Sequence, residues 1–165
     1  MSKKFKYPLL SNAFNSQDIK VGINVLKSKF ITMSNITLNF EKYFAKKMGS
    51  KYAVMTNSGS SANLLAISCL TNPLAKNKLT NGDEVIIPAV CWSTSLWPLI
   101  QNNLKPVFAD VELDTFNLDL DKIEKKITKK TKAIMLVHVL GISTNMIRLK
   151  KIINKHNLIL IEDTC

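Results

Sequence analysis

The sequence predicts an α/β protein with a mostly parallel sheet. From residue 51 onward, short runs rich in β-branched residues alternate with longer runs in which apolar residues recur at helical spacing. This alternation is typical of a sheet whose strands are joined by helices, because parallel strands need a long crossover. The strand candidates are residues 52–56, 84–87, 106–110, 133–138 and 158–162, and the helix candidates are residues 61–70, 93–101, 119–127 and 146–156.

The first 50 residues lack this alternation. Residues 1–15 predict an extended arm, and residues 16–28 and 36–48 predict two helices. Ser16 is the expected N-cap of the first helix, and Gly49 is the expected stop of the second. We therefore expect the chain to divide between residues 1–50 and residues 51–165.

The composition is that of a globular domain or of a piece of a larger one. The 165 residues are 46% hydrophobic, but the longest apolar runs fall far short of the ~20 residues that a membrane helix needs. No apolar segment follows the basic start, so no secretory signal is predicted. Three widely spaced cysteines favour a reducing cytoplasm over a disulfide framework. Two histidines provide no zinc-ligand spacing, so no metal site is expected.

The net charge of +11 raises the possibility of a nucleic-acid partner. Of the 23 basic residues, however, only Arg148 is an arginine, and the lysines are scattered in pairs. Nucleic-acid binders use arginine for bidentate contacts with bases and phosphates. We interpret the lysines as a solvated surface and expect no nucleic-acid partner, with a lysine-rich nucleic-acid binder kept as an alternative.

A candidate phosphate site follows the first predicted strand. In a parallel sheet, ligands bind beyond the carboxyl ends of the strands. Here the chain reads Thr56-Asn57-Ser58-Gly59-Ser60-Ser61-Ala62-Asn63 and then becomes an apolar helix. Small side chains at a helix start leave backbone N–H groups open to an anion. The same stretch could simply be a serine-capped helix start. It is neither a P-loop nor a dinucleotide-binding glycine motif.

Two further residues at strand ends complete a constellation. Trp92 follows the second strand and could stack on a planar ligand, or it could be a buried core residue. Asp163 ends the fifth strand, where a carboxylate is costly without a cationic or hydrogen-bonding partner. A phosphate cradle, an aromatic plate and a carboxylate together fit pyridoxal 5′-phosphate (PLP), which has a phosphate, a flat ring and a protonated ring nitrogen. We interpret Cys91 as a small buried hydrophobe and His138 as structural.

The same residues resemble a known family, the DegT/DnrJ/StrS-type sugar aminotransferases, which are PLP enzymes. The resemblance runs in order through nearly the whole chain. Its stretches are Phe40-Glu41, Phe44-Ala45, Gly49-Ser50-Lys51-Tyr52-Ala53-Val54, Ser58-Gly59-Ser60-Ser61-Ala62-Asn63-Leu64-Leu65, Gly82-Asp83-Glu84-Val85-Ile86, Pro88-Ala89, Trp92-Ser93-Thr94, Pro106-Val107-Phe108-Ala109-Asp110-Val111 and Glu162-Asp163. Residues 30–33, 58–63, 92–94 and 163–165 are most similar to the branch of GDP-4-keto-6-deoxymannose 3-dehydratases, which remove the C3 hydroxyl of a nucleotide-linked keto-sugar.

The resemblance implies a fold and a set of cofactor residues. Residues 51–165 would be the N-terminal part of the large domain of the aspartate-aminotransferase fold (PLP fold type I), which would be incomplete here. The cofactor, PLP or pyridoxamine 5′-phosphate (PMP), would be bound by Gly59, Ser60, Ser61, Asn63, Trp92 and Asp163. The glycine and the serines would bind the phosphate with help from the asparagine, the tryptophan would stack on the ring, and the aspartate would pair with the pyridine nitrogen.

The resemblance also implies what lies outside the chain. The family's reacting residue, a lysine in aminotransferases or a histidine in 3-dehydratases, is expected beyond Cys165. We therefore expect an N-terminal fragment of a longer protein, inactive by itself and without a catalytic residue of its own. The complete enzyme would transaminate or dehydrate a nucleotide-linked 4-keto-6-deoxysugar for surface polysaccharide, with glutamate or a similar amino donor, as a cytoplasmic homodimer. The alternative is a non-catalytic fragment or scaffold of the same fold.

Overall fold

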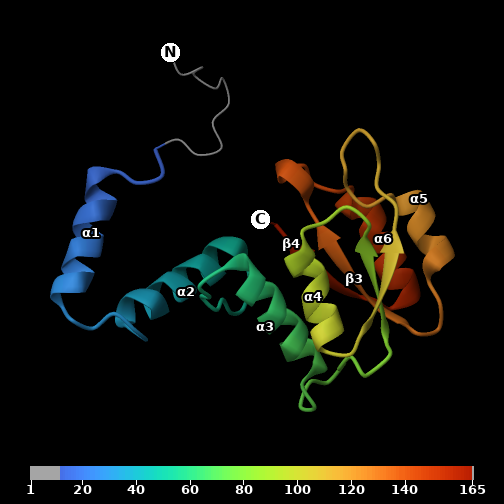
Figure 1. The fold of residues 1–165 in the computed structure, drawn as a ribbon, viewed down its shortest axis with the longest axis horizontal. Helices are drawn as coiled ribbons and strands as arrows, with labels where there is room; N and C mark the ends of the chain where they lie inside the picture. Colours follow the sequence, from blue (N-terminus) through green and yellow to red (C-terminus); the bar gives the residue numbers. More distant parts are fainter. Residues whose placement is uncertain (1–11, 165) are drawn as a thin grey trace. The chain divides into compact units, whose positions relative to one another are not determined.

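The computed structural model describes residues 12–164, so most of the expected N-terminal arm and Cys165 lie outside the described residues (Figure 1). The chain forms two units, one ending at Met55 and the other beginning at Thr56. No helix within residues 12–164 is long and apolar enough to cross a membrane. The elements are α1 (Ser16–Lys27), α2 (Asn35–Met48), α3 (Gly59–Thr71), β1 (Glu84–Pro88), α4 (Ser93–Gln101), β2 (Lys105–Ala109), α5 (Leu120–Ile123), η1 (Glu124–Lys126), β3 (Thr131–Val137), η2 (Val139–Gly141), α6 (Met146–His156) and β4 (Ile159–Asp163).

The first unit contains the two expected helices, α1 and α2. The N-cap of α1 is Asn15 and not Ser16, which corrects the sequence expectation. The Asn15 side chain accepts from the N–H of Asp18, and the Asp18 carboxylate accepts from the N–H of Asn15, which makes a reciprocal capping box. Helix α2 ends as expected at Gly49, whose φ of +67° places it in the left-handed region that glycine tolerates.

The expected strand at residues 52–56 is wrong. These residues form no strand in the structure. The backbone N–H of Met55 donates to the Glu41 side chain at 2.8 Å, so at this position a carboxylate on α2 takes the place of a neighbouring strand. The β-branched composition favoured an extended segment, but a strand also needs a hydrogen-bonded partner, and composition does not reveal whether a partner exists.

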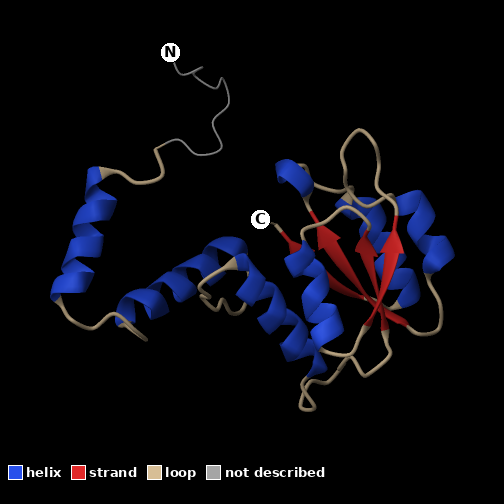
Figure 2. Ribbon diagram, in the orientation of Figure 1, coloured by secondary structure: helices blue, strands red, loops and turns tan. Residues whose placement is uncertain are grey.

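The second unit is built on a four-stranded parallel sheet in the order β2-β1-β3-β4 (Figure 2). The expected strands at residues 84–87, 106–110, 133–138 and 158–162 are therefore confirmed, with ends that shift by one or two residues. Strand β2 lies on one side of β1, and β3 lies on the other side. The strand order therefore reverses between β1 and β3, and the reversal point is at their carboxyl ends. Such a reversal opens a crevice at the carboxyl edge of the sheet.

Helices cover both faces of this sheet, as expected for parallel strands. Alternate strand residues point to opposite sides, so each face has its own apolar cluster. One cluster joins helices α3 and α4 to the sheet through Ile67, Leu79, Val85, Ile87, Leu99, Leu104, Ala133, Met135 and Ile161. The other joins helices α5 and α6 through Ile86, Ala109, Leu118, Leu120, Ile123, Ile134, Leu136, Leu149, Ile152 and Leu158.

The helix expected at residues 119–127 is shorter than the sequence suggested. It divides into a single α-helical turn, α5, and the 3₁₀ turn η1. The N–H of Ile127 donates to the carbonyl of Glu124, an i to i+3 bond that tightens the end of the segment before β3. The helices expected at residues 93–101 and 146–156 have the observed ends of α4 and α6.

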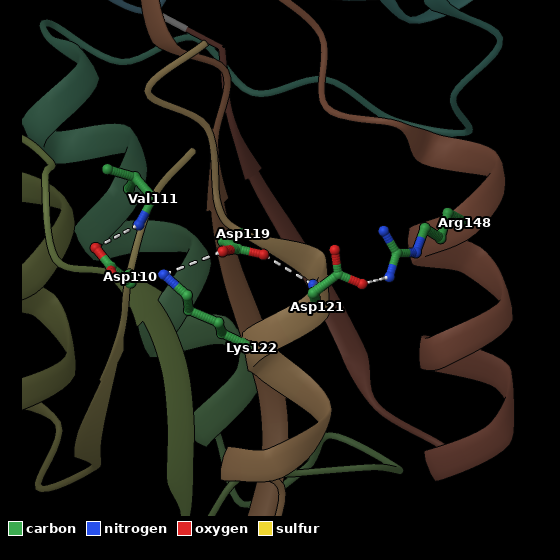
Figure 3. A network of polar contacts seen from close by, with 6 residues as sticks. All are labelled: Asp110, Val111, Asp119, Asp121, Lys122 and Arg148. Carbon is green, nitrogen blue, oxygen red and sulfur yellow. Dashed lines mark hydrogen bonds and ion pairs between the residues drawn. The ribbon is translucent and has the colours of Figure 1, made fainter. Parts of the chain in front are cut away.

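An ionic network fastens the carboxyl end of β2 to helices α5 and α6 (Figure 3). The Nζ of Lys122 lies 2.8 Å from Asp110 Oδ2 and 3.3 Å from Asp119 Oδ2. Arg148, on α6, pairs with Asp121, and its bond lowers the pKa of that carboxyl. Likewise the bond from Lys122 lowers the pKa of Asp110. Apart from Asp119, these side chains are largely exposed, so each of these ion pairs contributes little to the stability of the fold.

A buried carboxylate holds the opposite, amino edge of the sheet together. Glu84, at the start of β1, receives a bond from Lys105 Nζ at 3.0 Å on Oε1. Its Oε2 receives bonds from the hydroxyls of Thr128 at 2.6 Å and Thr131 at 3.3 Å. These contacts connect the starts of β1, β2 and β3. The hydrogen bond from Thr128, and after it that from Lys105, lowers the pKa of Glu84.

We predict that Ile67→Ala destabilises the chain by about 2–5 kcal/mol, whereas Ile67→Val costs only about 0.5–1.5 kcal/mol. Ile67 is fully buried between α3 and the sheet, so truncation leaves a cavity. Urea unfolding followed by circular dichroism measures both changes. Leu74→Ala, at a residue that is 93% exposed, is the control and should stay within about 0.5 kcal/mol. Equal losses at residues 67 and 74 would contradict the packing of α3.

We predict that Glu84 stabilises the chain at neutral pH and loses this effect in acid. Its pKa is lowered in the fold, so its contribution is complete above its ordinary value of 4.5 and disappears as the pH falls through the lower, folded value. Thermal unfolding of the wild-type chain and of Glu84→Gln between pH 7 and pH 3 tests this. The variant should unfold at a lower temperature at pH 7, and the difference should narrow below pH 4.5. A gap that widens in acid would contradict the prediction.

Candidate functional site

Helix α3 begins at Gly59, two residues earlier than expected. Ser58 is its N-cap, and the Ser58 Oγ accepts from the N–H of Ser61 at 3.2 Å. The serine-capped helix start is therefore confirmed as the local structure. Within residues 12–164, the N–H groups of Gly59 and Ser60 have no acceptor, as is usual in the first helical turn. A Cβ built on Gly59 would meet nothing within 4 Å, so this helix end is open to a ligand.

The carboxylate of Asp163 lies at the carboxyl end of β4 and accepts hydrogen bonds from Ser95 and Asn63. Ser95 Oγ donates to Asp163 Oδ2 at 2.7 Å, and Asn63 Nδ2 donates to the same oxygen at 2.8 Å. These residues come from α4 and α3, so the carboxylate connects the last strand to two helices. The hydrogen-bonding partners expected for a carboxylate at this strand end are therefore present.

Sequence reasoning missed Ser95. The residue is fully buried in the first turn of α4, and Leu99, one turn further on, is also fully buried. A serine on the apolar side of a helix needs a hydrogen-bonding partner inside the protein. This polar interruption of the apolar face was the signal that could have found it.

The expected site residues are divided between two open recesses. One recess of about 350 Å³ is lined by Gly59, Ala62, Asn63, Glu162, Asp163 and Thr164. The other, of about 310 Å³, is lined by Ser60, Ser61, Leu64, Thr94, Trp97, Pro98 and Gln101. The structure thus brings Gly59, Asn63 and Asp163 together, and the two serines open toward α4. An anion in either recess could accept hydrogen bonds from the backbone N–H groups at the start of α3.

Trp92 is not a core residue. Its side chain is 76% exposed, so the alternative of a buried core tryptophan is wrong. Trp92 is the N-cap of α4, and its carbonyl accepts from the N–H of Ser95 at 2.9 Å. The backbone of Trp92 is therefore bonded to Ser95, the same residue whose hydroxyl donates to Asp163. The ring lines neither recess and has a face available to a planar partner.

Cys91 and His138 both lie close to Asp163. Burial, and after it the negative charge of Asp163, raises the pKa of Cys91, which keeps the thiol protonated. The Nδ1 of His138 accepts from the N–H of Thr144 at 3.3 Å, so its Nε2 carries the proton toward Glu162 Oε2 at 3.1 Å. Its backbone N–H donates to the carbonyl of Asp163, which aligns β3 with β4.

Residues 13–165 match the DegT/DnrJ/EryC1/StrS aminotransferase family. The GDP-4-keto-6-deoxy-D-mannose 3-dehydratase of Escherichia coli O55:H7 is 43% identical over 96% of this chain and 41% of its own length. The dTDP-3-amino-3,6-dideoxy-alpha-D-galactopyranose transaminase of Aneurinibacillus thermoaerophilus is 36% identical over 89% of this chain and 39% of its own length. The chain therefore spans about two fifths of the length of these relatives.

Solved structures agree with these relatives in fold. E. coli GDP-4-keto-6-deoxy-D-mannose-3-dehydratase with bound hydrated PLP superposes with a TM-score of 0.90 at 43% identity, over 97% of this chain and 41% of that one. NtdA from Bacillus subtilis with bound PMP gives a TM-score of 0.82 at 30% identity, over 97% and 37%. The expected aminotransferase fold class is thus confirmed. The chain belongs to the DegT/DnrJ/EryC1/StrS aminotransferase family.

Proposed function

We propose that the carboxyl edge of this sheet binds PLP or PMP. The observation that carries the proposal is the Asp163 carboxylate, held by Ser95 and Asn63 in the recess that also contains Gly59. An anionic carboxylate suits a protonated pyridine nitrogen, and the start of α3 suits a phosphate. The residues present therefore fit both ends of the cofactor.

Each expected residue has a task in this proposal. The N–H groups of Gly59 and Ser60 and the serine hydroxyls would bind the phosphate, and the exposed ring of Trp92 would cover one face of the pyridine ring. Asn63 would contribute by holding Asp163, since its amide donates to that carboxylate in the structure. When bound, the cofactor supplies an electron sink that stabilises negative charge on the substrate carbon.

Bound cofactor in related structures supports this proposal. The E. coli 3-dehydratase structure contains hydrated PLP, and the NtdA structure contains PMP. Both superpose over 97% of this chain.

For the whole enzyme we propose C3 dehydration of a nucleotide-linked 4-keto-6-deoxysugar, with glutamate as amino donor. The GDP-sugar 3-dehydratases of E. coli and Yersinia pseudotuberculosis are 43% and 41% identical to this chain, and a dTDP-sugar 3-dehydratase of Saccharopolyspora spinosa is 48% identical over 76% of it, against 36% for the A. thermoaerophilus transaminase. In a 3-dehydratase the reacting residue expected beyond Cys165 would be a histidine. We further propose that the enzyme is a homodimer and that it works in the cytoplasm. The free thiols of Cys69 and Cys91 fit the reducing conditions of that compartment.

We predict that PMP stabilises this chain against thermal unfolding and that pyridoxamine, which lacks the phosphate, does so far less. At a PMP concentration of 100 times the Kd the gain should be about 2.7 kcal/mol. PMP is preferable to PLP as a probe, because its amine forms no Schiff bases with the many lysines of the chain. Differential scanning calorimetry measures the shift. Equal stabilisation by PMP and pyridoxamine would contradict the phosphate site.

A matched pair of variants locates the phosphate. Ser58→Asp keeps an N-cap side chain on α3 but places a negative charge at the helix start, so it should retain the stability of the chain and lose most of the gain from PMP. Ser34→Asp makes the same change at the N-cap of α2 and should leave the response to PMP unchanged. If Ser58→Asp binds PMP as the wild type does, the phosphate lies elsewhere.

For the complete enzyme, we predict that a GDP-linked 4-keto-6-deoxymannose incubated with PLP and glutamate loses the oxygen at C3. Mass spectrometry of the sugar nucleotide distinguishes this result from transamination, in which the sugar gains nitrogen and keeps its C3 oxygen. A stable product with an amine at C4 would favour the aminotransferase branch and would overturn the dehydratase proposal.

A further inference from the structure

We propose that Ser95 is a positioning residue that, together with Asn63, fixes the carboxylate of Asp163 for the ring nitrogen of the cofactor. This inference rests on the proposed function and adds to it a residue that the sequence motifs did not indicate. Ser95 reaches the cofactor only through Asp163, because its hydroxyl donates to Asp163 Oδ2.

The geometry restricts the carboxylate to one orientation. Both donors contact the same oxygen, Oδ2, at 2.7 Å from Ser95 and 2.8 Å from Asn63. They belong to two helices, so a rotation of the carboxylate would break both bonds at once. A planar ring requires its partner carboxylate to be held in a defined direction, since misplaced groups lose much of their effect.

The donors suit a carboxylate that faces a cation. A serine hydroxyl and an amide N–H both donate to Oδ2 of Asp163, so this oxygen acts as an acceptor toward both of them. Ser95 also lies in the first turn of α4, where the helix dipole is positive. An anion at this place can hold a proton on the ring nitrogen of a bound cofactor.

Burial makes the interaction of Ser95 strong and specific. The residue has no exposed surface, so its hydroxyl has no access to bulk water as an alternative partner. Ser95 could nevertheless serve only to attach α4 to β4. The two roles predict different results, because a purely structural contact has no preference for ligands that contain a ring nitrogen.

The test compares PMP with its deaza analogue, in which a C–H replaces the ring nitrogen. Wild-type chain should bind PMP more tightly than the analogue, as measured by isothermal titration calorimetry. Ser95→Ala should weaken PMP binding roughly tenfold, the loss of one hydrogen bond to a charged group, and should leave the analogue unchanged. The absorption spectrum of bound PMP should show that its ring nitrogen loses the proton at a lower pH in the variant.

Thr71→Val is the matched control. The Thr71 hydroxyl donates to Asn102 Oδ1 at 2.9 Å between α3 and α4, so the variant removes a similar bond in the last residue of α3, far along the chain from Asp163. It should lower stability without changing the preference for PMP over the analogue. Asn63→Ala removes the second donor and should reduce the same preference. It provides the answer if Ser95→Ala does not fold.

Two negative results have different meanings. If Ser95→Ala and Asn63→Ala weaken both ligands equally, or neither, the positioning role is wrong while the cofactor site remains. If wild-type chain binds neither PMP nor the analogue, the proposed function itself fails, and the inference fails with it. A preference for PMP that disappears in both variants and persists in Thr71→Val supports the proposal.

Discussion

The cost of a carboxylate at the end of a half-buried strand determines the arrangement of the candidate site. Asp163 lies two residues after Ile161, which packs in the cluster beneath helices α3 and α4, and its carboxylate contacts residues near the starts of both helices. A carboxylate in this position needs hydrogen bonds from the protein. Asn63 and Ser95 supply them, and in doing so they connect β4 to α3 and α4. The polar contact that defines the site is thus also a tertiary contact of the fold.

Each edge of the sheet has a carboxylate with several hydrogen-bond donors, and the two carboxylates are held differently. At the amino edge, Glu84 receives bonds on both oxygens, from Lys105, Thr128 and Thr131, and its role is to join three strand starts. At the carboxyl edge, the neutral donors Asn63 and Ser95 share one oxygen of Asp163. The order of strands in the sheet places the reversal at this second edge, where parallel sheets bind ligands. Glu84 and the candidate site at Asp163 therefore lie at opposite edges of the sheet.

Much of the fold could be predicted from the sequence, because periodicity reports burial. The apolar runs of β1 and β3 and the helical spacing of α4 and α6 identified these elements. The strand predicted at residues 52–56 is absent from the structure, because the β-branched composition of these residues carries no information about a partner strand. Asp163, Trp92 and the start of α3 follow predicted strands and could be located by position. Ser95 interrupts the apolar side of its helix, which marks it as a polar residue in need of a partner, but periodicity does not identify that partner, which is 68 positions away along the chain.

The same dependence on distant residues explains why the apolar core matters to the chemistry. Ser95 is placed by α4, and α4 is held by Leu99, which is fully buried in the cluster that contains Met135 and Ile161. Asn63 is placed by α3, which is held by Ile67 in that same cluster. Hydrogen bonds of 2.7 and 2.8 Å tolerate little displacement, so a shift of either helix would change the direction of the Asp163 carboxylate. One apolar cluster thus sets the positions of both donors, and the orientation of the charged group is a consequence of packing on a single face of the sheet.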